Sequence, residues 1–215
     1  MTTLKAKLDG IYDTLMESYS DTPFFSALIA GSLATVGLSI DSPSTIIGAG
    51  LLSPIGTFII QANLLKFLKN NNYDFKGHKI SPWYIPILLI VITTLVVSYI
   101  LGKIIIRFNN PFTGEPLNKD WPTQSMQVRA MPINAVYYIP VALLCGLLLP
   151  VLIVNHNISG FVGVGIATSL LPPIANIGLS LNFKYNPLVH PPELQHYRRD
   201  AVLTGFAIFI INLIL

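Results

Sequence analysis

Charged side chains are scarce in this sequence. Lys, Arg, Asp and Glu together make up 11% of its 215 residues, whereas an ordinary soluble domain carries about 25%. Hydrophobic residues reach 52% and the mean hydropathy is +0.62. The composition excludes an ordinary water-soluble globule. It predicts an integral membrane protein that crosses the lipid bilayer several times, in a membrane that the sequence does not specify.

Cysteine and histidine are too few or too scattered for several kinds of site. The only cysteine, Cys145, lies inside an apolar run, so neither a disulfide framework nor a thiolate metal site is available. The four histidines lie in polar connections with no carboxylate at ligand spacing, and phosphate-loop and dinucleotide-binding patterns are absent. We expect no metal and no cofactor. Lys and Arg flank apolar runs instead of forming a basic stripe, which argues against nucleic acid as a partner.

A catalytic centre inside the membrane would also lack essential residues. Asp41 is the only carboxylate between Asp21 and Asp74, whereas an aspartyl protease needs two neighbouring carboxylates. A serine hydrolase needs a base beside its nucleophile, and neither Ser53 nor Ser169 has a histidine or lysine near it in its apolar run. We therefore expect that the protein is not an enzyme.

Six apolar runs predict an all-α bundle of about six transmembrane helices. They cover residues 24–40, 45–65, 83–102, 133–154, 160–181 and 201–215. A span needs about 20 residues, so the last run, with 15, predicts a helix that is short or truncated. Lys and Arg divide almost evenly between the two sides, 6 against 7, so the positive-inside rule assigns no orientation.

The residues before the first run have apolar positions at helical spacing. Residues 1–23 therefore predict an amphipathic segment, which either lies in the membrane interface or caps the bundle.

The second and fifth runs resemble each other. Residues 47–63 read IGAGLLSPIGTFIIQAN and residues 166–182 read IATSLLPPIANIGLSLN, an offset of 119 residues with six identical positions. An offset of three helices reverses the direction of the chain. The pattern thus predicts a 3+3 inverted repeat, with halves at residues 24–106 and 133–215 and a polar connecting loop at residues 107–132.

Prolines lie in the middle of both related runs. Because proline removes a backbone hydrogen bond, we predict broken second and fifth helices, which in matching positions are typical of a transporter's central site. An ion or small solute would then pass along Ser53, Pro54, Thr57, Thr168, Ser169, Pro172, Pro173 and Asn176. The alternative is a membrane module that does not transport and packs against a partner protein or lipid, with prolines that only kink the helices.

Asp41 has two interpretations. In the sequence Asp-Ser-Pro before an apolar run it predicts a turn and a helix N-cap, with Pro43 in the first turn. Alternatively it belongs to the pathway, because charged residues at membrane depth are often functional.

Four stretches of the chain resemble a known family. Gly37–Gly56, GLSIDSPSTIIGAGLLSPIG, and Gly160–Leu181, GFVGVGIATSLLPPIANIGLSL, are similar to the membrane family of domain of unknown function 389, as are Trp121–Arg129 and Asp200–Leu215. The resemblance covers most of the chain after residue 24. It implies a compact multi-helix membrane domain whose activity is not established. The lipid bilayer is the expected partner, and a second expectation, left open by the sequence, is that the chain associates with itself into a homo-oligomer.

Overall fold

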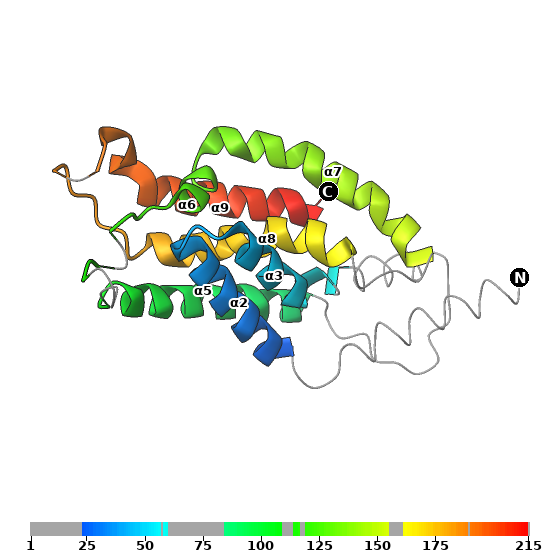
Figure 1. Cartoon of the computed structure of the whole chain (residues 1–215). Helices are drawn as coiled ribbons and strands as arrows, with labels where there is room; N and C mark the ends of the chain where they lie inside the picture. Colours follow the sequence, from blue (N-terminus) through cyan, green and yellow to red (C-terminus); the bar gives the residue numbers. More distant parts are fainter. Residues whose placement is uncertain are drawn as a thin grey trace, which may run out of the picture.

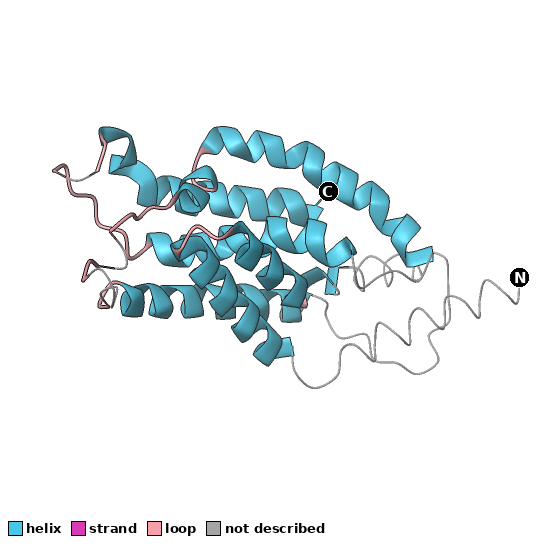
Figure 2. Ribbon diagram, in the orientation of Figure 1, coloured by secondary structure: helices cyan, strands magenta, loops and turns pink. Residues whose placement is uncertain are grey.

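A computed structural model of the chain describes residues 23–56, 58–59, 84–108, 114–116, 119–154, 161–188 and 190–214. Figure 1 shows these residues as a bundle of helices. No β-strand occurs in the described ranges, so the predicted all-α class is confirmed (Figure 2). Residues 1–22, which hold nearly all of the predicted amphipathic segment, lie outside the described residues.

Each apolar run is helical over most of its described residues. The long helices are α2 (Pro23–Ser39), α3 (Pro43–Leu52), α5 (Tyr84–Ile105), α7 (Pro132–Val154), α8 (Phe161–Ser180) and α9 (Tyr197–Ile214). The last of these has 18 residues, because it begins four residues before the predicted run. The expectation that this helix is short or truncated stays a prediction. A short 3-10 helix, η1 (Pro192–His196), leads into α9.

The connecting loop at residues 107–132 contains a helix that the sequence patterns did not predict. This is α6 (Gln124–Val128), whose N-cap Thr123 accepts a hydrogen bond from the Met126 amide. The Thr123 hydroxyl also donates to the Leu38 carbonyl at 2.6 Å. Because Leu38 lies at the end of α2, this bond holds α6 against the turn between α2 and α3.

That turn has the hydrogen bonds of a Schellman motif. The amide of Ser42 donates to the Gly37 carbonyl and the amide of Asp41 donates to the Leu38 carbonyl, so the orphan carbonyls of α2 are satisfied. Asp41 takes the left-handed position, with φ 54°. The predicted turn is confirmed. The N-cap of α3 is Ser42 and not Asp41, because α3 begins at Pro43 and Asp41 is the left-handed residue one position before the cap.

Small residues bring α2 close to α5. Ala27 and Thr35 are fully buried, and a Cβ added at Gly31 would lie 3.3 Å from the Thr94 backbone. The hydroxyls of Thr35 and Ser98 lie 2.7 Å apart and join the two helices. Small side chains with hydroxyl pairs are the usual contact between helices in membranes.

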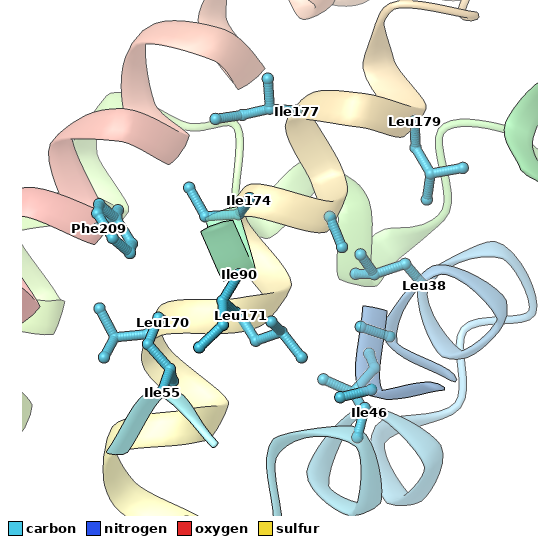
Figure 3. Packing of buried hydrophobic residues seen from close by; sticks show 14 of the residues in the cluster. Leu38, Ile46, Ile55, Ile90, Leu170, Leu171, Ile174, Ile177, Leu179 and Phe209 are labelled. Carbon is cyan, nitrogen blue, oxygen red and sulfur yellow. The ribbon is translucent and has the colours of Figure 1, made fainter. Parts of the chain in front are cut away.

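The core of the bundle lies around α8. This helix packs against α2, α3, α5, α7 and α9, and every residue from Leu170 to Ser180 is buried. Figure 3 shows Leu170, Leu171 and Ile174 of α8 clustered with Ile90, Ile55 and Leu38, which come from the first half of the chain. The two halves do not pack alike. α8 packs closely against α9, whereas α3 and α5 are not a closely packed pair in the described ranges. The inverted repeat therefore stays a prediction.

The outer side of α5 is apolar. Leu88, Ile92, Val96 and Ile100 are each about half exposed, whereas Thr94 and Ser98 are buried beside the apolar core of the bundle. In a soluble protein the exposed side of a helix is mostly polar. Within the described residues α5 is the one helix both long enough and apolar enough to cross a membrane, with a mean hydropathy of 2.5; other apolar helical stretches are shorter.

Candidate functional site

The second apolar run is interrupted at its proline. Helix α3 ends at Leu52, and Ser53 has extended backbone angles (φ −75°, ψ 126°). The Ser53 amide donates to the Gly50 carbonyl, three residues back, and the Ser53 hydroxyl accepts from the Ile55 amide at 3.4 Å. The backbone bonds of a regular helix are thus replaced on both sides of Pro54. The predicted break in this helix is confirmed at Ser53, which is 8% exposed.

The fifth run behaves differently. α8 continues from Phe161 to Ser180 with Pro172 and Pro173 inside it, so the predicted break there is wrong. Each proline removes one hydrogen bond, but the turns on both sides keep theirs. Both prolines are buried among the neighbouring helices, which hold such a helix together. The two proline-containing runs nevertheless meet, because α3 packs against α8.

Asn176 joins three helices. Its Nδ2 donates to the Met126 carbonyl of α6 at 3.0 Å, and its Oδ1 accepts from the Tyr197 hydroxyl of α9 at 2.9 Å. The side chain is fully buried. These bonds give Asn176 a structural task, and its role along a pathway stays a prediction. Three further predicted pathway residues, Thr57 and the side chains of Thr168 and Ser169, lie outside the described part of the chain.

Asp41 lines a pocket of about 440 Å³ at the end of the bundle. Its Oδ1 accepts a hydrogen bond from the Ser125 amide at 2.8 Å, so the turn and α6 form the pocket together. The remaining walls come from the start of α3 and from α6: Pro43, Ile46, Ile47, Gln124, Ser125, Val128 and Arg129. Neither Ser53 nor Asn176 lines this pocket, so Asp41 lies apart from those two predicted pathway residues.

Arg129 is the cation of this pocket. Its Nη1 donates to the Ser125 carbonyl at 2.7 Å, while its Nε is buried and has no hydrogen-bond partner within the part of the chain that the structure describes. Burial lowers the pKa of the guanidinium from its ordinary value, and Tyr138 and Asp41 oppose this shift. Arginine stays charged even so. The sequence patterns missed Arg129. The available signal was a lone arginine within the family-like stretch Trp121–Arg129.

Comparison with protein families decides the classification. The family model described as Domain of unknown function (DUF389) matches residues 80–215, more than half of the chain. The chain belongs to this family. The match includes the family-like stretches from residue 121 onward, whereas Gly37–Gly56 lies before it. Searches found no matching curated protein and no matching solved structure.

The described residues contain no group of three or more His, Cys, Asp or Glu side chains that could hold a metal ion. The described residues show three separate polar features: the helix break at Ser53, the network around Asn176 and the charged pocket at Asp41.

Proposed function

We propose that this member of the DUF389 family is a multi-pass integral membrane protein that passes an ion or small solute between the broken α3 and the neighbouring α8. The observation that carries the proposal is the end of α3 at a buried Ser53, in the middle of an apolar run and against α8. Irregular backbone at membrane depth is stable where it is buried in protein or lines a water-filled path.

Two further observations support the proposal. The outer faces of α5 and α7 are apolar: Leu88, Ile92, Val136 and Leu144 are each at least half exposed. Lipid would cover such faces, which are rare on soluble proteins. Inside the bundle, the buried Thr94 hydroxyl has no hydrogen-bond partner among the described residues, and a buried hydroxyl normally has one from protein or water.

Thiol labelling tests the path. Single cysteines replace Ser53 or Ser169 in a Cys145→Ser background, and membranes are treated from each side with a charged, membrane-impermeant methanethiosulfonate. Glu193, exposed in η1, gives the reactive control variant. Ser98, fully buried between α2 and α5, gives the unreactive one. We expect the cysteine at position 53 to react. If it is as unreactive as the cysteine at position 98, water does not reach the break and the transport proposal fails.

Membrane placement needs its own test. We expect the protein to stay in the membrane pellet during alkaline carbonate washing, because lipid covers its apolar faces. Release into the supernatant would contradict the membrane placement itself, whatever the labelling shows.

A further inference from the structure

The pocket at the end of the bundle holds two opposite charges that are not paired with each other. Both Asp41 and Arg129 make their hydrogen bonds with the backbone of Ser125, on its amide and its carbonyl respectively. The Arg129 guanidinium lines the pocket and keeps its positive charge. Within the described residues its hydrogen bond to the Ser125 carbonyl leaves that charge without an anionic partner, so an anionic oxygen that enters the pocket beside it would be stabilised.

Asp41 stands where glycine is the usual residue. The left-handed position of a Schellman motif is occupied mostly by glycine, and other residues there carry a conformational cost. What the aspartate adds is a carboxylate at the rim of the pocket. Its Oδ1 is used by Ser125, and Oδ2 makes no hydrogen bond with the described residues. A cation that donates hydrogen bonds would fit this oxygen.

An apolar track leads out of the pocket along α3. Ile47 lines the pocket and Leu51 follows one turn later; both are more than 40% exposed. Beside them, Gly48 leaves open space, since an added Cβ would meet no atom of the described residues within 4 Å. A hydrocarbon chain could therefore lie along this side of α3 without displacing a side chain.

We propose that the pocket binds a zwitterionic phospholipid with a primary amine, phosphatidylethanolamine. Its phosphate lies at Arg129, its ammonium at Asp41, and one acyl chain follows Ile47 and Leu51. The proposal goes beyond solute passage. It depends on the membrane placement argued above but not on transport.

The charges favour this headgroup over others. The two pocket charges sum to zero, which suits a zwitterion, whereas an anionic headgroup would leave the Asp41 carboxylate without a counter-charge. A primary ammonium donates hydrogen bonds to a carboxylate, and the trimethylammonium of phosphatidylcholine cannot. A volume of about 440 Å³ is within the usual range for small-molecule sites.

Native mass spectrometry of the purified full chain in detergent measures the binding. Dimyristoyl phosphatidylethanolamine, phosphatidylcholine and phosphatidylglycerol are titrated in parallel, together with free phosphoethanolamine. The variants are D41N and R129Q, with E193Q as control, because Glu193 is an exposed carboxylate outside the pocket. In D41N the new side-chain carbonyl can still accept from the Ser125 amide, so this variant keeps the turn even if R129Q disturbs α6.

We expect the wild type and E193Q to prefer phosphatidylethanolamine over phosphatidylcholine about tenfold, the effect of one charge-assisted hydrogen bond. D41N should bind the two lipids equally, and R129Q should weaken both. Equal binding of the two lipids by the wild type, or unchanged preference in D41N, would overturn the proposal. Free phosphoethanolamine binding as tightly as the lipid would show that the ligand is a soluble zwitterion, which also overturns it. None of these results depends on the labelling of Ser53, so failure here is distinct from failure of the transport proposal.

Discussion

The apolar runs that contain α3 and α8 share a pattern of two leucines, a proline and an isoleucine, yet the two helices differ in shape and surroundings. α3 stops before its proline, and its leucines, Leu51 and Leu52, are about half exposed. α8 runs through two prolines, and its leucines, Leu170 and Leu171, are 0% and 1% exposed. Among the helices that the structure describes, α8 packs against five others, whereas α3 packs closely against α2 and α8 alone. A proline therefore opens a helix where few neighbours support it, and only removes a bond where packing is complete.

Truncation of the matched leucines should show the largest difference. We expect Leu171→Ala to lower the free energy of unfolding by about 2–5 kcal/mol, because it leaves a cavity in the core. Leu52→Ala should change it by less than about 0.5 kcal/mol, because that side chain faces outward. Thermal unfolding of both variants in the same detergent measures the contrast. Equal losses would mean that α3 is buried, in a homo-oligomer for example.

Asn176 anchors α8 to its neighbours, and its removal should have the next largest effect. Asn176→Ala leaves the Met126 carbonyl and the Tyr197 hydroxyl without their partner, so we expect a loss of about 2–3 kcal/mol in unfolding free energy. Tyr197→Phe removes one of the two bonds and should lose less. A larger loss for Tyr197→Phe than for Asn176→Ala, measured by unfolding in detergent, would contradict this account.

Replacing one glycine by alanine in each helix should change the free energy of unfolding in opposite directions. A Cβ at Gly178 of α8 would lie 2.6 Å from the Ser98 Cβ and 2.8 Å from the Leu95 carbonyl oxygen of α5, so Gly178→Ala should destabilise by about 1–3 kcal/mol. A Cβ at Gly48 of α3 meets nothing within 4 Å, so Gly48→Ala should stabilise by about 0.5–1 kcal/mol through helix propensity. The same detergent melts compare them. A destabilising Gly48→Ala would mean that another surface covers α3.

The sequence predicted the helices better than it predicted the sites. Hydropathy located five of the long helices within a few residues, because length and apolarity are local properties, whereas the predicted second run extends well beyond the end of α3 at Leu52. The prolines predicted a break in both runs, at Pro54 and at Pro173. The sequence could not show that only the first helix breaks, since the difference lies in which helices pack around each proline. The pocket was missed for a similar reason. Asp41 and Ser125 are 84 residues apart in the chain, and no periodic pattern in the sequence predicts that they meet.

The smallest stability effect is expected at the start of α3, where a charge is removed and little else changes. Asparagine tolerates the left-handed conformation of Asp41, and its carbonyl can replace Oδ1 as acceptor for the Ser125 amide. Asp41→Asn should thus shift the free energy of unfolding by less than about 0.5 kcal/mol. A loss of 2 kcal/mol or more would mean that the charge itself holds α6 in place. In that case the carboxylate serves the turn, and its removal could not be used to show that it binds a ligand's ammonium.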